Sequence, residues 1–164
     1  MPSEGRTAEK EHKIEIKEVA DETTLSMACF LVSEYSWGYD YPVDPVKEIR
    51  KAEYRIGAFA DEKLVGFSAV SRHASPDHQD NGELWFSYAV VAPEFRGRGI
   101  FTSLYDSCLA YAKTVPGRFL SCTDNPIVER FLLAQGWHVS RSTLDESDRS
   151  STVFELYRTG KEAQ

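Results

Sequence analysis

The sequence predicts an α/β fold in which helices pack against a mixed sheet, and three observations predict it. Short segments of alternating or continuous apolar residues, typical of strands, recur along the chain. Amphipathic segments with helical spacing separate several of these strands. Asp, Asn, Pro and Gly stand at the boundaries, as they do at helix caps and turns. The expected order of elements is βααβββαβαββ.

The first half of the chain is expected to form a strand, two helices and a β-hairpin. Residues 12–20, HKIEIKEVA, alternate apolar and polar side chains and predict the first strand. Asp21 is expected to cap a helix that ends at the aromatic loop SWGYDYP, residues 36–42. Asp44-Pro45 is expected to open a short second helix. Residues 54–60 and 63–72 are then expected to form the two strands of a hairpin.

The second half contains the most apolar strand. Residues 83–91, ELWFSYAVV, follow a polar loop over 73–82, and their continuous apolar run indicates burial on both faces at the centre of the sheet. A helix then begins at a glycine turn and ends at Pro116-Gly117. The remaining elements are expected to be a strand over 118–123, a helix over 124–136, and paired strands over 137–141 and 152–158 joined by a polar loop.

Length and composition indicate one globular domain. The 164 residues can bury a core of ordinary size, and 41% hydrophobic with 27% charged residues is typical of a soluble protein. We expect residues 1–12 to be a disordered tail and residues 13–160 to form a single domain. Because we find neither a membrane-spanning apolar run nor a signal peptide, we expect a cytoplasmic protein with no membrane partner.

Charge and cysteine content argue against several classes of function. The formal net charge of −7 argues against general nucleic-acid binding, which needs a basic face. Cys29, Cys108 and Cys122 are widely spaced and odd in number, so they predict neither a metal site nor a disulfide framework. A homodimer is compatible with the sequence, which does not determine the oligomeric state.

The turn RGRG, residues 96–99, ends the central strand and opens a helix. Backbone N–H groups at a helix N-terminus point outward, and the helix dipole makes that end positive. Gly97 and Gly99 remove side chains that would block a ligand, while Arg96 and Arg98 add charge. The turn therefore predicts a phosphate or pyrophosphate site. It lacks the lysine of a nucleotide P-loop, and Thr102 replaces the third glycine of the dinucleotide fingerprint.

The turn resembles the signature of the GNAT family of N-acetyltransferases, Arg/Gln-x-x-Gly-x-Gly/Ala. The match covers Arg96 to Phe101, and the family-like VAPEFR precedes the turn. A second family-like segment follows at Asn125, Phe131, Gly136 and Trp137. The expected order of elements also matches, so the resemblance extends over residues 14–158. It implies the GNAT fold, in which the central strand splays from its neighbour.

This resemblance implies an acetyl-CoA site with three parts. The pantetheine arm would pair with the central strand, the N–H groups of residues 97–102 would hold the pyrophosphate, and Asn125 would contact the pantetheine end. The implied contacts are Ala89, Val91, Arg96, Gly97, Arg98, Gly99, Phe101, Thr102 and Asn125. Phe101 stands at a small-residue position of the family pattern, which is tolerable because the backbone N–H is the binding group there.

Acetyl transfer to an amine needs a neutral nitrogen, so a base or a water chain must remove a proton. Family bases align with Trp85 and Ser87, and neither is a base. Glu83 lies on the same face of the strand and is our candidate base, with a surface glutamate as the alternative interpretation. Leu132 stands where many members have the tyrosine thought to protonate the leaving thiolate, and leucine cannot donate a proton.

The aromatic loop stands where the family builds its acceptor pocket. Trp37, Tyr39 and Tyr41 offer aromatic faces for an ammonium group, and Asp40 offers charge. These four residues predict a small cationic primary amine as acceptor, although they could instead simply close the core. A non-catalytic acyl-CoA sensor and a protein or peptide N-acetyltransferase remain alternatives. The latter would need an open groove between the first helices and the last hairpin.

Four other side chains have simpler interpretations. Cys122 is expected near the thioester but is best explained as a buried small hydrophobe. His73 and His78 are expected on a solvated loop that borders the acceptor site, and His138 is expected to point outward from a strand.

Overall fold

A mixed sheet of seven strands organises the structure, in the order β1-β2-β3-β4-β5-β7-β6. The computed structural model describes residues 13–38 and 40–157, so the predicted tail over residues 1–12 lies outside them. The predicted α/β fold and order of elements are confirmed. The strands are β1 (Ile14–Glu18), β2 (Tyr54–Ala60), β3 (Lys63–Ser71), β4 (Leu84–Val91), β5 (Phe119–Thr123), β6 (His138–Leu144) and β7 (Ser150–Leu156). The α-helices are α2 (Glu22–Val32), α3 (Pro45–Lys51), α4 (Ile100–Ala112) and α5 (Pro126–Ala134).

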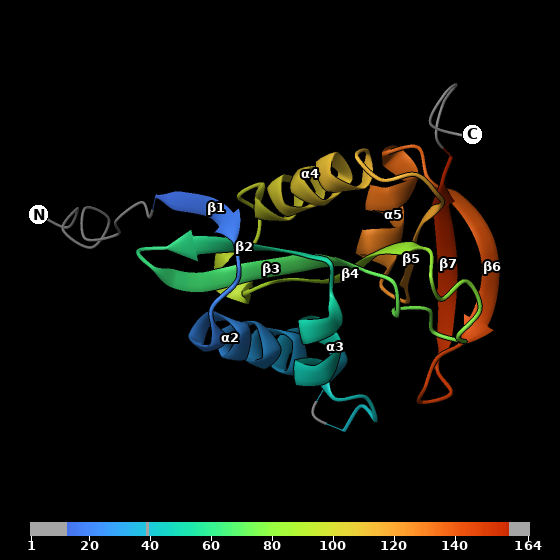
Figure 1. Ribbon diagram of the computed structural model, residues 1–164, viewed down its shortest axis with the longest axis horizontal. Helices are drawn as coiled ribbons and strands as arrows, with labels where there is room; N and C mark the ends of the chain where they lie inside the picture. The colour runs from blue at the N-terminus through green and yellow to red at the C-terminus, as the bar shows by residue number, and fades with distance from the viewer. Residues whose placement is uncertain (1–12, 39, 158–164) are drawn as a thin grey trace, which may run out of the picture.

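Helices cover both faces of the sheet (Figure 1). α2 and α3 lie on one face and α4 on the other. Helical spacing places Leu104, Cys108 and Ala112 on one side of α4, where each is at most 1% exposed. Ala28 and Val32 of α2 are fully buried in the same way. These contacts hold β4 between two helical layers, which explains the apolar run along it.

Three helices begin at side-chain caps, and the sequence predicts two of them, Asp21 and Asp44. In each, a side-chain oxygen accepts a hydrogen bond from a backbone N–H of the first turn, at 3.3 Å for Asp21, 3.0 Å for Asp44 and 2.9 Å for Asn125. Pro45 and Pro126 occupy the first turn of α3 and α5, where a missing N–H is harmless. Asn125 is therefore held at the end of β5 by its own role as a cap.

The parallel strands β4 and β5 separate soon after they begin. Within the described part of the chain they pair at two positions, Leu84 with Phe119 and Trp85 with Leu120. One step further, the Ser121 hydroxyl donates to the Phe86 carbonyl at 2.8 Å. Residues 87–91 of β4 then have a strand, β3, on one edge only. In Figure 1, β6 and β7 run steeply across the direction of β2 and β3, as this splay requires.

A bulge interrupts β4 inside the splay. The register between β3 and β4 shifts between Phe67 and Ala69, and Tyr88 within the bulge has a φ of +58°. A left-handed backbone is strained for a bulky residue. The bulge also changes which residues of β4 face the opening.

Two predicted boundaries are wrong. The helix expected to run out at the aromatic loop continues through Trp37 as a π-helical segment, η1 (Ser33–Trp37), and Gly38 ends it with a φ of +85°. β6 continues to Leu144, three residues into the predicted loop, because Ser142, Thr143 and Leu144 pair with β7. These residues lie on an edge strand, where polar side chains are normal, so their polarity concealed the strand.

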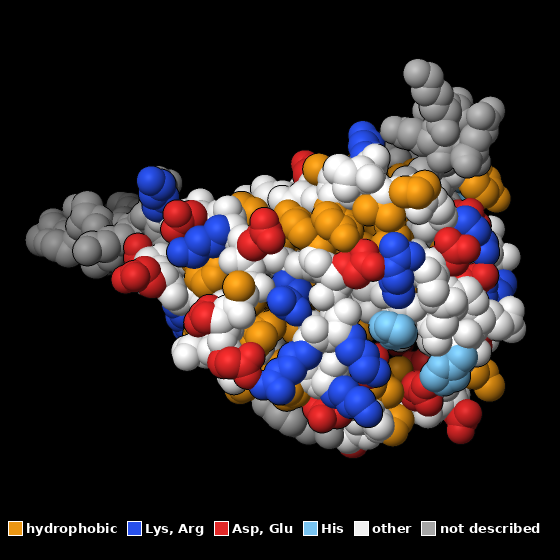
Figure 2. All heavy atoms as spheres, viewed as in Figure 1, with side chains coloured by type: hydrophobic (Ala, Val, Ile, Leu, Met, Phe, Trp, Pro, Cys, Tyr) orange, Lys and Arg blue, Asp and Glu red, His pale blue; other side chains and the backbone are white. Residues whose placement is uncertain are grey.

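Charged side chains of both signs are interspersed over the face shown in Figure 2. The lysines and arginines on this face lie among carboxylates and apolar side chains. Among the described residues, no helix is long and apolar enough to span a bilayer.

Candidate functional site

A cleft of about 730 Å³ lies in the splay between β4 and β5. Its size suits a small-molecule site. One wall comes from η1, the connection before α3, and α3 itself, and the other comes from β5, α5 and the β6–β7 connection. The lining includes Trp37, Tyr41, Glu48, Tyr88, Ala89, Val91, Arg96, Gly97, Phe101, Cys122 and Asn125. Most of the residues predicted for the two ligands therefore come together in one place.

The backbone groups of Ala89 and Val91 face the opening. The Ala92 N–H donates to the Val65 carbonyl of β3 at 2.8 Å. Because successive residues of a strand direct their N–H and C=O groups to opposite edges, Val91 and Ala89 direct theirs away from β3. Arg96 Nε donates to the Val91 carbonyl at 2.9 Å, which fastens the glycine turn to the end of the strand. The rest of this edge is available to an extended ligand, which could pair with it as a strand does.

The glycine turn forms an open cradle at the start of α4. Gly97 and Gly99 both have a φ of +79°, and a Cβ at either position would meet no atom within 4 Å. Gly99 is the N-cap of α4 and has no side chain to occupy the N–H groups of the first turn. These groups, with the positive end of the helix dipole, suit an anion.

The side chains around the cradle leave its backbone accessible. The Phe101 ring packs edge-to-face against Phe86 and Phe131, with centroids 6.0 and 5.0 Å away, so it turns into the core. The Arg98 guanidinium lies over the Phe95 ring at 5.0 Å. Arg98, Gly99 and Thr102 belong to the turn and first turn of α4 but do not line the cleft.

The predicted acceptor residues are only partly brought together. Trp37 and Tyr41 line the cleft with ring centroids 5.0 Å apart. Burial raises the pKa of Tyr41 to about 12, so its hydroxyl stays protonated at neutral pH. Asp40 is exposed and does not line the cleft. Tyr39 lies outside the described residues.

The predicted base, Glu83, lies outside the cleft lining. Its carboxylate accepts a hydrogen bond from the Arg118 backbone N–H at 3.2 Å, where β4 and β5 are still paired. A role for Glu83 in proton transfer therefore stays a prediction without support from the geometry. Leu132 is fully buried, so it offers no surface to a ligand.

Three carboxylates that the sequence does not mark line the part of the cleft around Trp37 and Tyr41, which we call the acceptor end after its predicted ligand. Glu48 comes from the first turn of α3, and its side chain is 16% exposed. Asp145 and Glu146 come from the β6–β7 connection. Asp145 accepts hydrogen bonds from the backbone N–H groups of Ser147 and Arg149, so it holds the connection in shape. Only the folded chain brings these residues together, and no motif marks them.

Cys122 and two loop histidines also line the cleft. Burial raises the pKa of the Cys122 thiol to about 11, and its Sγ lies 3.9 Å from the Ala74 carbonyl oxygen. A protonated, packed thiol agrees with the simpler interpretation. His73 and His78 are exposed at the rim. His138 is exposed elsewhere and stacks on Tyr157, with ring centroids 4.6 Å apart.

Two contacts with the β6–β7 connection cross the acceptor end, one from the opposite wall and one from the β3–β4 connection. The Arg149 guanidinium of the β6–β7 connection lies 5.3 Å from the centre of the Tyr41 ring. His78 Nε2 lies 2.7 Å from a carboxylate oxygen of Glu146, on the same connection. These contacts narrow the groove between the first helices and the last hairpin.

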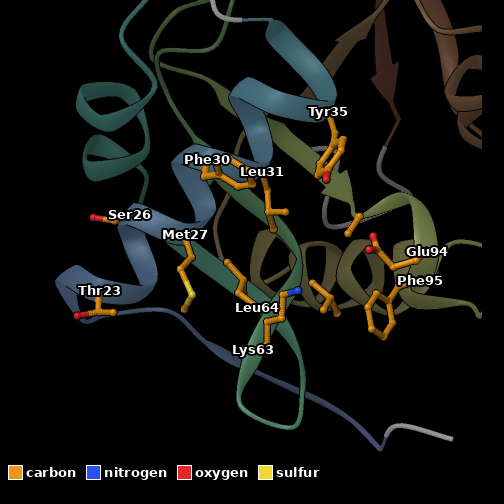
Figure 3. Close-up of a pocket in the computed structure, with 12 residues that line it drawn as sticks. Thr23, Ser26, Met27, Phe30, Leu31, Tyr35, Lys63, Leu64, Glu94 and Phe95 are labelled. Atoms are coloured by element: carbon orange, nitrogen blue, oxygen red, sulfur yellow. The ribbon is translucent and has the colours of Figure 1, made fainter. Parts of the chain in front are cut away.

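A second hollow of about 490 Å³ lies beside α2 (Figure 3). Met27, Leu31 and Leu64 contribute apolar side chains to it, and Lys63 and Glu94 are its charged residues. It contains neither the free strand edge nor the glycine turn. The cleft is therefore the better candidate for group transfer.

Comparison with known proteins agrees with this geometry. The sequence model of the acetyltransferase (GNAT) family matches residues 21–137. Among curated protein sequences, none matches the chain.

Solved structures share the fold at low sequence identity. A GNAT-family protein from Desulfovibrio desulfuricans has a TM-score of 0.67 at 14% identity, over 88% of this chain and 98% of its own. Arabidopsis thaliana NAA60, solved with a bisubstrate analogue, has a TM-score of 0.67 at 12% identity, over 88% and 97%. The ribosomal-protein-S18-alanine N-acetyltransferase of Escherichia coli has a TM-score of 0.66 at 11% identity, over 91% and 97%.

Proposed function

The chain belongs to the acetyltransferase (GNAT) family, and we propose that it moves an acetyl group from acetyl-CoA to the primary amine of a small, cationic acceptor. The observation that carries the proposal is the pairing of an anion cradle with a free strand edge in one cleft. An elongated ligand with a phosphate at one end and amide groups along its arm fits both features. Acetyl-CoA, which supplies the activated acetyl group, has that form.

The residues of the cleft position the two reactants. The N–H groups at the start of α4, with the guanidinium of Arg96, would hold the pyrophosphate. Ala89 and Val91 would hold the arm through their backbone groups. Asn125 lies at the far end of β5 and would contact the end of the pantetheine. Holding the thioester and the amine in contact supplies much of the rate enhancement expected of such an enzyme.

Three features of the acceptor end support a small cationic amine. Trp37 offers an aromatic face to an ammonium group, and the neighbouring Tyr41 ring already accommodates a cation, the Arg149 guanidinium. Glu48 and Asp145 provide negative charge with little exposure to solvent, their side chains being 16% and 14% exposed. The contact of Arg149 with Tyr41 narrows the groove that a peptide would need. Structural relatives include an N-acetyltransferase named for a ribosomal protein, so peptides belong in the test.

The first experiment measures the melting temperature with and without acetyl-CoA. Binding to the native state raises stability by about 2.7 kcal/mol when the ligand is at 100 times its Kd. We expect a clear rise for the wild type and none for Gly99→Glu, because the new carboxylate would stand in the anion cradle. Gly136→Glu is the matched control. Gly136 has a φ of +96° and equally open surroundings, but it lies outside the cleft lining.

The second experiment follows the release of free CoA with a panel of alkyl monoamines, diamines and peptides with free N-termini. We expect turnover with small cationic amines and little with peptides. An acetyl-CoA shift without turnover across the panel would favour the acyl-CoA sensor, for which Leu132 in place of the family tyrosine is the supporting feature. Turnover with peptides alone would refute the small acceptor.

A further inference from the structure

Tyr88 carries two unfavourable features at one position in the cleft. Its backbone is left-handed, with a φ of +58°. Its hydroxyl is the one buried side-chain polar atom among the described residues that has no hydrogen-bond partner. A buried hydroxyl without a partner is unfavourable because its lost contact with water is not replaced, and a left-handed backbone adds strain at a bulky residue. Strained residues and buried polar groups without partners are enriched at functional sites, so this position is a candidate for a role in function.

The surroundings of Tyr88 place its hydroxyl on the acceptor side of β4. The Tyr88 ring packs edge-to-face against Trp37, with centroids 5.5 Å apart, on the face covered by α2 and η1. Burial is the main cause that raises the pKa of Tyr88 well above its usual value. Ser71 lies close enough to lower this pKa, but its hydroxyl does not meet hydrogen-bond geometry with Tyr88. Among charged groups, Glu48 affects this pKa most.

Glu48 is the candidate for the base that takes a proton from the acceptor amine at this end of the cleft. It projects from the first turn of α3, lines the cleft beside Tyr88, and its side chain is 16% exposed. Lys51, one turn further on, lies 3.6 Å from it. Asp145 is already committed to the backbone of its own loop, and Glu146 faces His78. Asp124, the remaining carboxylate of the lining, is exposed to solvent next to Asn125. Glu48 is thus the carboxylate best placed to accept a proton from the amine.

We propose that Glu48 and Tyr88 are catalytic residues of the transfer, Glu48 as the base and Tyr88 as the hydrogen-bonding contact of the acceptor nitrogen. This proposal rests on the acetyltransferase function proposed above. The hydroxyl is shielded from solvent in the free protein, so the acceptor reaches it when a neighbouring side chain shifts. Trp37 is the suitable neighbour, because it is only partly buried and is followed by Gly38, which has a φ of +85°.

The proton balance follows from these assignments. The ammonium group gives one proton to Glu48, and the freed lone pair forms a C–N bond with the acetyl carbonyl carbon. The C–S bond breaks, its electron pair stays on sulfur, and the sulfur receives a second proton that originates on the nitrogen. Glu48 returns the first proton to solvent. The products are the acetamide, free CoA and one proton.

Tyr88→Phe tests the hydroxyl while keeping the ring. With the best amine of the panel we expect kcat/KM to fall about 10- to 100-fold, as for one hydrogen bond made to the reacting group. The melting temperature should stay the same or rise, since the hydroxyl has no partner to lose, and the acetyl-CoA shift should be unchanged. Tyr54→Phe is the control, because Tyr54 stacks on Tyr111 outside the cleft lining.

Glu48→Gln tests the base. General bases contribute about 10²- to 10⁴-fold, so we expect kcat to fall in that range at pH 7. The deficit should shrink as the pH rises toward the pKa of the amine, about 10, where solvent leaves more of the nitrogen neutral. Glu83→Gln is measured alongside. If Glu83→Gln gives this pH signature and Glu48→Gln does not, Glu83 is the base and our assignment of Glu48 is wrong.

The remaining outcomes are equally decisive. A full rate in Tyr88→Phe overturns the catalytic role of Tyr88, and a lower melting temperature shows that its hydroxyl has a structural partner instead. A wild type that binds acetyl-CoA but acetylates no amine overturns the proposed function, and this proposal with it. A working wild type with two unaffected variants overturns this proposal alone.

Discussion

Asp77 fixes the loop that forms one rim of the cleft. Both of its carboxylate oxygens accept hydrogen bonds from Arg141 of β6, at 2.8 and 3.0 Å. Such two-pronged pairs are among the stronger polar contacts in proteins. Hydrogen bonds from Arg141 are the main cause that holds the pKa of Asp77 well below its usual value.

We expect Asp77→Asn to lower the free energy of unfolding by about 1–3 kcal/mol at pH 7. Because the folded pKa is depressed, this stability is present above the unfolded pKa of about 3.9 and is lost as the pH falls below it. Urea unfolding at pH 7 and at pH 3 would show the difference from wild type shrinking. Asp106→Asn, at an exposed site on α4, is the control. A difference that stays constant with pH would contradict the role of the charge.

At the scale of residues, the sequence could predict the backbone sites but not the acceptor side chains. Gly97 and Gly99 carry a local signal, since a positive φ and a helix N-terminus depend on neighbours in the chain. Glu48 and Tyr88 carry none. Their importance depends on a bulge, a loss of solvent contact and the packing of η1 against β4, all of which arise from tertiary structure.

At the scale of elements, the β2–β3 hairpin has a turn that Glu62, its second residue, does not favour. Asp61 and Glu62 both adopt positive φ angles, of +49° and +71°. A two-residue turn of this form prefers Asp-Gly, because glycine adopts a positive φ without strain. We expect Glu62→Gly to raise the free energy of unfolding by about 0.5–1 kcal/mol, measured by urea unfolding.

A glycine at the neighbouring position is the control, and it should change the free energy of unfolding in the opposite direction. Lys63 begins β3, so Lys63→Gly should destabilise the protein by a similar amount, since glycine weakens a strand. If both variants lose stability, the turn is not strained at Glu62. Comparing the two variants distinguishes relief of strain in the turn from the loss of stability that an added glycine causes through its flexibility.

Element order could be predicted because it depends on local periodicity and caps, as at Asp21 and Asp44. The two boundaries that were predicted wrongly depend on tertiary contacts. Residues 142–144 are polar because they occupy an edge strand, and residues 33–37 stay helical because Trp37 packs against Tyr88 and Tyr41. Neither contact can be read from neighbouring residues in the chain.

At the scale of the whole molecule, the splay divides the sheet into two parts. β1 to β4 form one and β5 to β7 the other, and the described residues of β4 and β5 pair at two positions. An aromatic cluster joins the parts on the α4 face, where Tyr105 packs against Phe131 at 5.0 Å and accepts a 2.7 Å hydrogen bond from Trp137. The cleft lies in the gap between the two parts and reaches this face as well, where Phe101 of α4 and Val128 of α5 line it. An extended ligand in the splay would therefore pair with the free edge of β4 and fill the gap in the sheet.

This arrangement predicts a defined pattern of amide hydrogen exchange. Without ligand, the amides of Ala89 and Val91 should exchange quickly, because they face the opening rather than β3. With acetyl-CoA at 100 times its Kd, their exchange should slow about 100-fold. The amides of β2, paired on both edges, should change little. The Gly99→Glu variant should show no such protection. If acetyl-CoA protected residues 97–102 alone, the cradle would bind the phosphate groups, but the strand edge would not hold the arm, and the thioester would lie away from Tyr88.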